Sequence, residues 1–342
     1  MGCSFFYNRR KMLSRCSLAQ SIRHCIWRSK NLTCERAPVV KNVTQPAMGP
    51  HLKPSCQPIH NQTTITEDII TTPPSAATTK KKLSSRKRRQ LNLLAFNTRT
   101  LSVSTSEKKQ MNDPNASTKL AKLVTEVCSM KPAIDVAALG EVRRPGTGSV
   151  VQGDMTLYYS GHKEHKVEGV GILLKSNLVR FVLAVDNISS RLMAIRGVFH
   201  GMKMVIIAGY APTECADRTT KIAFYAAVDQ YIQSIPAPFR QHILLLGDLN
   251  ARLGAYTDTW STVRGIYGSG STTNENGQLL LELCARHELF ITNTMFNKKN
   301  YGTWKHPRSK RWHTLDWCMV HRSMKWLVKN CGIEPSIECN SD

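Results

Sequence analysis

The sequence predicts an α/β sandwich in which two stacked sheets are flanked by helices. Short apolar runs rich in β-branched and aliphatic residues recur after Gln90. These runs are apolar on both faces, which is typical of strands in the middle of a covered sheet. Stripes with helical spacing are fewer and lie between some of the runs. Many strands with few helices outside them favour two sheets packed face to face.

Six apolar runs are predicted to be strands, each ending in a polar or glycine-containing turn. They are LNLLAFN (91–97), DVAALGE (135–141), GVGILL (169–174), MVIIAGYAP (204–212), HILLLGDLN (242–250) and LFITNTMF (289–296). Three apolar stripes repeat at i, i+3, i+4 and i+7 or a shorter part of that pattern, and they are predicted to be helices. Their positions are Leu120, Leu123, Val124 and Val127; Phe224, Ala227, Val228, Tyr231 and Ile232; and Leu279, Leu280, Leu283 and Cys284.

Length and composition limit the class of protein. The 342 residues are enough for one large domain or two ordinary ones, and the 41% hydrophobic content excludes a wholly disordered chain. No uncharged apolar run reaches the roughly 18 residues that a membrane span needs, so we expect no membrane partner. The eleven cysteines form no CxxC pair, which favours a reducing compartment over a disulfide framework or zinc ribbon. The formal charge of +23 predicts a polyanionic partner, with nucleic acid ahead of an acidic membrane surface.

The basic residues are unevenly distributed between two parts of the chain. Residues 1–90 contain 17 Lys plus Arg and three acids, a charge of +14, while residues 91–342 contain 30 and 21, a charge of +9. Because residues 1–90 lack periodic apolar segments, we predict a disordered basic leader followed by one domain over 91–342. The run KKKLSSRKRRQ at 80–90 fits a solvated linker, a nuclear import signal or a phosphate-binding arm. We take nuclear localisation as the prediction.

Polar side chains follow four of the predicted strands at the point where each strand ends. They are Asn97, Glu141, Tyr210 and the pair Asp248 and Asn250. Each alone also fits an ordinary turn, strand-end or surface role. Strand ends that converge on one edge of the sandwich would instead place these groups in a single cleft. Asp248 and Asn250 alternate on one face after the run HILLLG, where a buried unpaired carboxylate is costly. Oxygen ligands without sulfur or histidine neighbours favour Mg²⁺, or Mn²⁺, over zinc.

A set of motifs in fixed order resembles the endonuclease/exonuclease/phosphatase superfamily. More narrowly, the chain is similar to endonuclease domains of non-LTR retrotransposons and to the craniofacial development protein 2-like sequences derived from them. The similarity covers about 91–342 and implies a four-layer α/β sandwich of two mixed sheets. The motifs are LNLLAFNTRTL, AALGEVRRPGTGS, GVGILL, IIAGYAPT, ILLLGDLNARLG, FITNTMF, TWKHPRSKRWHTLDW and the final NSD.

This resemblance implies a Mg²⁺-dependent phosphodiesterase that nicks DNA and is of retrotransposon origin. The implied metal ligands are Asn97, Glu141 and Asp342. Asp248 would orient or deprotonate the attacking water, and Asn250 would hold a phosphate oxygen. The implied role of Tyr210 is to bond the phosphate or support the metal site, and that of Asp316 is to orient the family's catalytic histidine. Phosphodiester hydrolysis needs an in-line water, charge neutralisation and protonation or metal capture of the leaving group, which such a set supplies.

Residues that contact DNA are also predicted, partly from the resemblance. Thr303 matches a threonine that lines the DNA face in retrotransposon members. The segment 304–313 interleaves aromatic and basic residues, so we expect a hairpin that stacks on bases and touches phosphates; a hairpin with a solvated outer face is the alternative. The predicted nucleic-acid-binding residues are Arg143, Arg144, Arg191, Thr303, Trp304, His306 and Arg308.

The end of the chain departs from the family pattern. The family motif is Ser-Asp-His, whereas the sequence stops at Ser341 and Asp342. We therefore expect a truncated C-terminal strand and weak or no activity for the chain as written, whether as a fragment or as a decayed copy. Gly140 also stands where many members have Gln or Ser, which affects a supporting hydrogen bond.

Three functions of different classes fit the sequence. The first is a Mg²⁺-dependent DNA endonuclease, and the second is a non-catalytic nucleic-acid-binding remnant of one. The third is a phosphatase or phosphodiesterase acting on a small phosphoester. DNA is the predicted partner, with no small-molecule cofactor beyond the metal, and the sequence does not indicate an oligomeric state.

Overall fold

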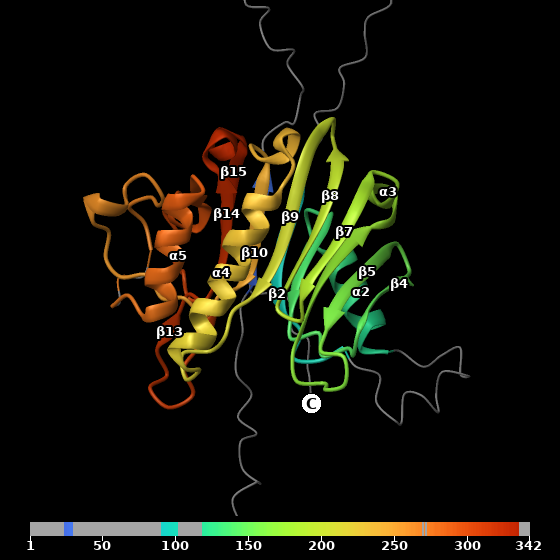
Figure 1. The fold of residues 1–342 in the computed structure, drawn as a ribbon, viewed down its shortest axis with the longest axis horizontal. Coiled ribbons are helices and arrows are strands. Elements are labelled where there is room, and N and C mark those ends of the chain that lie inside the picture. Colours follow the sequence, from blue (N-terminus) through green and yellow to red (C-terminus); the bar gives the residue numbers. More distant parts are fainter. Residues whose placement is uncertain (1–23, 30–89, 102–117, 269, 271, 335–342) are drawn as a thin grey trace, which may run out of the picture. The chain divides into compact units, whose positions relative to one another are not determined.

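Two mixed β-sheets face each other in the structure, a computed structural model that describes residues 24–29, 90–101, 118–268, 270 and 272–334 (Figure 1). The first sheet has the strand order β15-β1-β2-β3-β6-β5-β4 and the second β11-β14-β10-β9-β8-β7. The strands of the first sheet are β1 (His24–Ser29), β2 (Asn92–Asn97), β3 (Val136–Gly140), β4 (Thr147–Gln152), β5 (Met155–Gly161), β6 (Gly169–Lys175) and β15 (Val328–Glu334). Those of the second are β7 (Val182–Ser189), β8 (Leu192–Phe199), β9 (Met202–Tyr210), β10 (Ile243–Asp248), β11 (Leu289–Ile291) and β14 (Asp316–His321).

The longer helices cover the outer faces of the sheets. The described helices are α2 (Lys119–Ser129), the short α3 (Ser176–Val179), α4 (Arg218–Ser234) and α5 (Glu275–Arg286). Single 3₁₀ turns add η1 (Ala237–Phe239), η2 (Asp258–Trp260), η3 (Thr292–Thr294) and η4 (Arg322–Leu327). A small hairpin of β12 (Trp304–Lys305) and β13 (Trp312–His313) completes the described elements. None of the described helices is long and apolar enough to cross a membrane.

Alternation along β2 explains why the sandwich has four layers. Leu93 and Ala95 point into the apolar cluster between the two sheets, while Leu94 and Phe96 point to the opposite face, where α2 packs. On the second sheet, α4 and α5 pack on the outer face, where Phe224 and Leu280 join a third apolar cluster. Both faces of each sheet are therefore covered, which confirms the predicted sandwich of two mixed sheets flanked by helices.

One parallel strand pair in each sheet determines where the polar strand ends lie. β2 runs parallel to β3, and β9 runs parallel to β10, while the other described pairs are antiparallel. Parallel strands have their carboxyl ends at the same edge of a sheet. The two pairs also contact each other across the sandwich, β2 with β10 and β3 with β9. The carboxyl ends of four strands therefore converge at one place.

The sixth predicted strand is only partly correct. β11 is a strand over Leu289–Ile291, but the chain then forms the 3₁₀ turn Thr292–Thr294. Hydroxyl groups compete with strand pairing here, because Thr292 Oγ1 donates to the Cys318 carbonyl at 2.8 Å and Thr294 Oγ1 to the Ile291 carbonyl at 2.6 Å. The other five predicted strands and all three predicted helices are present in the predicted segments.

Strand β1 corrects the prediction that all of residues 1–90 form a disordered leader. Residues His24–Ser29 pair antiparallel with β2 on one side and with β15 on the other. This short segment has no periodic signal of its own, and its hydrogen bonds come from strands distant in the sequence. Residues 1–23 and 30–89, which include nearly all of the basic run at 80–90, lie outside the described residues. The same is true of Asp342 and of the segment in which the C-terminal truncation was predicted.

Candidate active site

The four converging strand ends open into a cavity of about 770 Å³. Asn97 ends β2, Glu141 follows β3, Tyr210 ends β9, and Asp248 ends β10, with Asn250 two residues further on. The predicted polar set is thereby brought together, as the strand-end argument requires. The cavity lining consists of Asn97, Arg99, Thr100, Lys119, Glu141, Arg143, Tyr210, Thr213, Glu214, Cys215, Asp248, Asn250, Arg252, Asn274, Trp304, His306, His313 and Leu315.

Asn97 bridges two acids of the cavity, Glu141 and Asp248, through hydrogen bonds. Asn97 Nδ2 donates to Glu141 Oε1 at 2.7 Å and, more weakly, to Asp248 Oδ2 at 3.4 Å. The other Glu141 oxygen accepts from Arg143 Nη2 at 2.7 Å. Four residues of the cavity lining have left-handed backbone, with φ of 53° at Arg99, 50° at Glu141, 52° at Arg143 and 47° at Asn250. Non-glycine residues seldom adopt this conformation, and such strain is concentrated at functional sites.

Asp248 and Asp316 form a carboxylate pair in which Asp316 is buried and Asp248 is half-buried in the cavity lining. They are directly opposite each other in the β10–β14 ladder. Burial raises the pKa of Asp248 well above its usual range, and the adjacent Asp316 charge raises it further. Burial also raises the pKa of Asp316 to about 6. Two carboxylates that face each other in this way favour the presence of a cation or a proton between them.

The hydroxyl group of Tyr210 remains a proton donor at neutral pH. Burial raises the pKa of this phenol, and the charges of Glu141 and Asp248 raise it further. The ring is held from one side by Arg191, whose guanidinium lies 5.1 Å from the ring centroid. Gly140 borders the ring, since a Cβ built at Gly140 would lie 3.5 Å from Tyr210 Cδ2. Any side chain at position 140 would thus stand in contact with the tyrosine.

The residues present fit a hard divalent cation. Asn97, Glu141 and Asp248 offer amide and carboxylate oxygens from three strands, and Asn250 offers another amide. Such oxygens are the ligands that Mg²⁺ prefers. Arg143 forms an ion pair with Glu141 at 2.7 Å, so a positive charge is already present beside this carboxylate. Among the described residues, no group of three or more His, Cys, Asp or Glu side chains has the geometry to hold a metal ion.

Several cavity residues were not predicted from the sequence. Arg99, Lys119 and Arg252 add basic groups to the wall, and Glu214 and Asn274 add an acid and an amide. Arg252 comes two residues after Asn250 in GDLNAR, and Asn274 is the first residue of NENG. Both were detectable as polar residues beside strong motifs. Arg99 and Lys119 were not, because only the fold brings them to the cavity.

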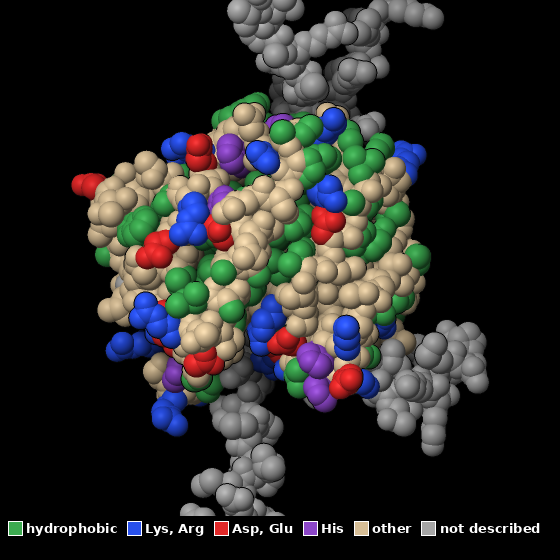
Figure 2. Space-filling view, in the orientation of Figure 1, with side chains coloured by type: hydrophobic (Ala, Val, Ile, Leu, Met, Phe, Trp, Pro, Cys, Tyr) green, Lys and Arg blue, Asp and Glu red, His purple; other side chains and the backbone are tan. Residues whose placement is uncertain are grey.

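The predicted DNA-contacting residues divide into two groups. Arg143, Trp304 and His306 line the cavity, and His313 joins them there. The Trp304 ring centroid lies 5.3 Å from that of His306 and 6.1 Å from that of His313, so the predicted hairpin carries an aromatic cluster. In Figure 2, basic side chains gather with histidines at the end of the view where β13 lies.

The remaining predicted DNA contacts lie elsewhere. Thr303 is fully buried, and its Oγ1 accepts from the Leu315 and Asp316 amides at 3.0 and 3.3 Å. Arg144 donates through Nε to the Leu101 carbonyl at 3.0 Å. Arg191 forms an ion pair with Glu168 at 2.5 Å, and exposed Arg308 lies in the hairpin turn. None of these four side chains lines the cavity. Thr303 is absent from the lining because it is buried, and Arg144 and Arg191 because they are paired with other groups of the protein.

Fold and site together define an α/β sandwich protein with an oxygen-rich, partly basic cavity at converging strand ends. No protein-family model matches the chain. The sequence is similar to craniofacial development protein 2 of Bos taurus, with 25% identity over 211 residues, which is 61% of this chain and 35% of that protein. The Tragulus javanicus protein of the same name is 23% identical over 61% of this chain and 36% of its own length. The match thus spans about a third of these relatives.

Among solved structures, the AP endonuclease LMAP from Leishmania major aligns with a TM-score of 0.49 and 13% identity. That alignment covers 72% of this chain and 84% of the other. The endonuclease domain of TRAS1, a telomere-specific non-LTR retrotransposon, aligns with a TM-score of 0.38 and 13% identity over 62% and 82% of the two chains.

Proposed function

We propose that the protein is a Mg²⁺-dependent phosphodiesterase that nicks DNA, as endonucleases of non-LTR retrotransposons do. The observation that carries this proposal is the convergence of Asn97, Glu141, Tyr210 and Asp248 in one cavity. Such groups at the ends of four strands match the needs of phosphodiester hydrolysis. The retrotransposon origin rests on the ordered motifs, and nuclear localisation rests on the basic run at 80–90.

Each cavity side chain has a distinct task in this proposal. Glu141 and Asn97 would hold the metal ion, which when bound supplies positive charge to the phosphate oxygens and the leaving group. Asp248 would orient a water, because its carboxylate is held in place by the Asn250 backbone amide at 3.0 Å. It would also accept the proton of that water. Tyr210, protonated at neutral pH, donates to a phosphate oxygen. Arg143 and Arg252 lie on the wall where phosphate charge must be balanced.

DNA is favoured over a small phosphoester by the basic and aromatic residues of the cavity lining. Arg99, Lys119 and Arg252 add three positive charges to the wall. Trp304, together with His306 and His313, offers flat rings for contact with bases. A single small phosphate ester needs neither feature.

Nicking of supercoiled plasmid at low salt tests the proposal. Because the resemblance implies a histidine after Asp342, the chain is assayed as given and with a histidine appended. We expect Mg²⁺-dependent conversion to open circles, strongest with the added histidine and abolished by a chelator. Asp248→Ala and Glu141→Gln should each lower the rate by about 100-fold or more, because each removes a group acting in the transition state.

The same assay separates the alternatives. Turnover of bis(p-nitrophenyl) phosphate without plasmid nicking would indicate a small-phosphoester hydrolase instead. If no version nicks DNA while all remain folded, the catalytic proposal fails.

A nucleic-acid-binding function without catalysis is the second candidate, and the basic cavity wall favours it. Binding through phosphates releases counterions, so the logarithm of affinity should fall linearly with the logarithm of salt concentration. Arg252→Ala should reduce that slope by about 1. Arg191→Ala is the matched control and should leave the slope unchanged, since Glu168 already neutralises Arg191. An affinity that does not change with salt would contradict both nucleic-acid functions.

A further inference from the structure

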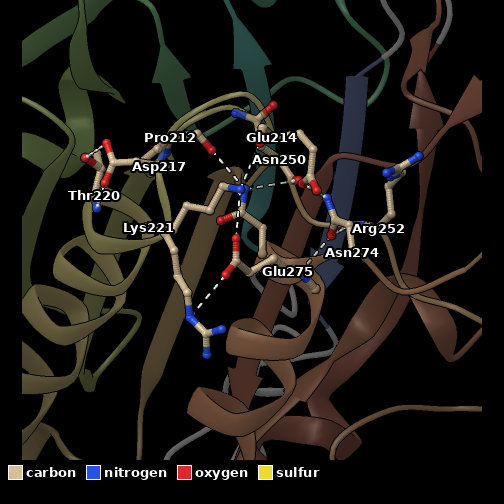
Figure 3. A network of polar contacts seen from close by, with 12 residues as sticks. Pro212, Glu214, Asp217, Thr220, Lys221, Asn250, Arg252, Asn274 and Glu275 are labelled. Carbon is tan, nitrogen blue, oxygen red and sulfur yellow. Dashed lines mark hydrogen bonds and ion pairs between the residues drawn. The ribbon is translucent and has the colours of Figure 1, made fainter.

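Asn274 is a buried residue of the cavity lining whose side-chain amide forms hydrogen bonds with four partners (Figure 3). Its Oδ1 accepts from the Arg252 and Gly277 amides, both at 2.8 Å. Its Nδ2 donates to Glu214 Oε2 at 2.5 Å and to the Asn250 carbonyl at 3.0 Å. Because donors face one end of the amide and acceptors face the other, its orientation is fixed by its partners.

A continuous set of contacts links Asn274 to the reacting groups. Asn274 holds the Asn250 carbonyl, and the Asn250 amide donates to Asp248 Oδ1 at 3.0 Å. The Asn250 side chain donates in turn to the Ala211 carbonyl at 2.9 Å, just after Tyr210. One amide therefore restrains the loop that carries Asp248, Asn250 and Arg252.

This loop needs a restraint because Asn250 has a left-handed φ of 47°. A non-glycine residue in that conformation persists only when its surroundings hold it. Neighbouring Asn276 assists, donating to the Pro212 carbonyl at 2.9 Å and to the Asn250 carbonyl at 3.4 Å. The bond from Asn274 to the Asn250 carbonyl is shorter, at 3.0 Å, and the same Nδ2 group also donates to Glu214.

The base of the network is itself anchored. Lys221, only 3% exposed, donates to the Glu214 carbonyl at 2.8 Å and to Glu275 Oε2 at 2.9 Å. Glu275 follows Asn274 at the start of α5, so Lys221 links this helix to the loop after β9 that carries Glu214. Asn274 is therefore fixed at the N-terminus of α5, and its partner Glu214 is also held through Lys221.

We propose that Asn274 is a positioning residue, whose Nδ2 group holds Asn250, and through it Asp248, in the geometry that hydrolysis requires. The proposal rests on the proposed function for its kinetic part, and on the loop contacts alone for its structural part. In this proposal Asn274 acts on the reaction through Asn250 and Asp248, not by contact with the reacting atoms.

Asn274→Asp tests this role with little change in shape. Aspartate keeps the Oδ1 acceptor for Gly277 and Arg252, so α5 remains capped. It cannot donate to the Asn250 carbonyl. Gln278→Glu is the matched control, because it makes the same amide-to-carboxylate change on exposed α5 surface. We expect Asn274→Asp to lower kcat for nicking by about 10- to 100-fold with KM changed less than about threefold, as for other small misplacements of reacting groups.

Hydrogen exchange gives a second readout that does not need activity. Amides of 249–254 should exchange faster in Asn274→Asp, while those of 278–286 in α5 should exchange as in the unaltered chain. Gln278→Glu should change neither kcat nor loop exchange. A double variant with Glu214→Gln removes the repulsion between two carboxylates, and it should remain impaired because the bond to Asn250 is still lost.

The outcomes separate the two proposals. If the unaltered chain nicks DNA and Asn274→Asp nicks equally well, or if Glu214→Gln fully restores the rate, the positioning role is wrong and the nuclease function stands. Faster exchange throughout α5 would also overturn it, because the residue would then be only a helix cap. If neither the chain as given nor the version with the appended histidine nicks DNA while both remain folded, the proposed function fails. Loop exchange then decides the positioning role, with faster exchange in Asn274→Asp in its favour and unchanged exchange against it.

Discussion

Thr303 shows how a residue next to the cavity differs from one that forms its wall. The side chain is 0% exposed, and its hydroxyl oxygen accepts from two consecutive backbone amides at the start of β14. This position fixes the strand that carries Asp316. A residue so placed acts on stability, whereas the resemblance implied a contact with DNA.

Thr303→Val should therefore destabilise the fold without weakening DNA binding. Valine has the same shape but leaves the Leu315 and Asp316 amides without an acceptor, at a cost of about 1–3 kcal/mol. Urea unfolding measures the loss, and Thr303→Ser, which keeps the hydroxyl, should recover most of it. A drop in DNA affinity at unchanged stability would restore the DNA-facing role.

At the scale of single residues, the sequence predicts the polar groups at strand ends and misses those that only the fold brings to the cavity. Asn97, Glu141, Tyr210 and Asp248 each follow a long apolar run, so a polar residue there stands out. Lys119 carries no such signal. It begins α2, and only the packing of that helix on β3 and its neighbours brings it to the cavity.

At the scale of elements, β7 is an edge strand that depends on side-chain bonds. Asp186 in β7 accepts from Arg196 Nε at 2.7 Å and from Tyr231 Oη of α4 at 2.7 Å. Burial acts to raise the pKa of Asp186, but the bonds from Arg196 and Tyr231 outweigh it and lower the pKa below 3.8. The ionised carboxylate thereby joins the edge of the second sheet to its covering helix.

Asp186→Asn should cost stability at neutral pH and little in acid. Because the folded pKa lies below the unfolded one, the contribution is fully present above about pH 4 and is lost as pH falls through the folded pKa. We expect a loss of about 1–2 kcal/mol at pH 7, typical of hydrogen bonds to a charged group in a partly exposed pair. Urea unfolding at pH 7 and pH 3 measures this, and an equal loss at both values would contradict it.

The β12–β13 hairpin is the element whose role in binding was predicted from its composition. Its Trp304 lines the cavity beside two imidazoles, whereas Trp326 in η4 is 65% exposed and lies away from the cavity. Stacking of a base on an aromatic ring contributes about 1–3 kcal/mol.

Trp304→Ala should lower affinity for single-stranded DNA by about 5- to 100-fold, the equivalent of that stacking energy. Fluorescence anisotropy with a labelled oligonucleotide measures it. Trp326→Ala removes an equally large aromatic side chain and should have no effect. Equal losses in the two variants would mean that the hairpin does not contact DNA bases.

At the scale of the whole molecule, predictability follows from how local the signal is. Strands buried on both faces, such as β3 and β10, appear as continuous apolar runs and were predicted. β4 and β7 have mostly exposed or half-buried residues, and neither was predicted. β1 is the extreme case, because its position depends wholly on pairing with segments far along the chain.

The position of β1 makes the predicted boundary at residue 90 testable. β1 lies between β2 and β15, with Ile26 opposite both Leu94 and Gly332. Removing residues 1–30 would leave the facing backbone groups of β2 and β15 without partners inside the sheet. Removing residues 1–23 keeps the strand, so the two deletions differ by β1 and Lys30.

We expect the chain lacking 1–30 to unfold at a temperature about 10 °C lower than the chain lacking 1–23. Several kcal/mol of lost pairing corresponds to a shift of that order for a domain of this size. The open edges should also promote association, which light scattering would detect. Ile26→Pro in the full chain, which removes only one strand N–H and fixes φ, should lower the melting temperature relative to Ile26→Val. Equal melting temperatures for both deletions would show that the sheet is complete without residues 24–29, and the domain would then begin at β2, as the sequence alone predicts.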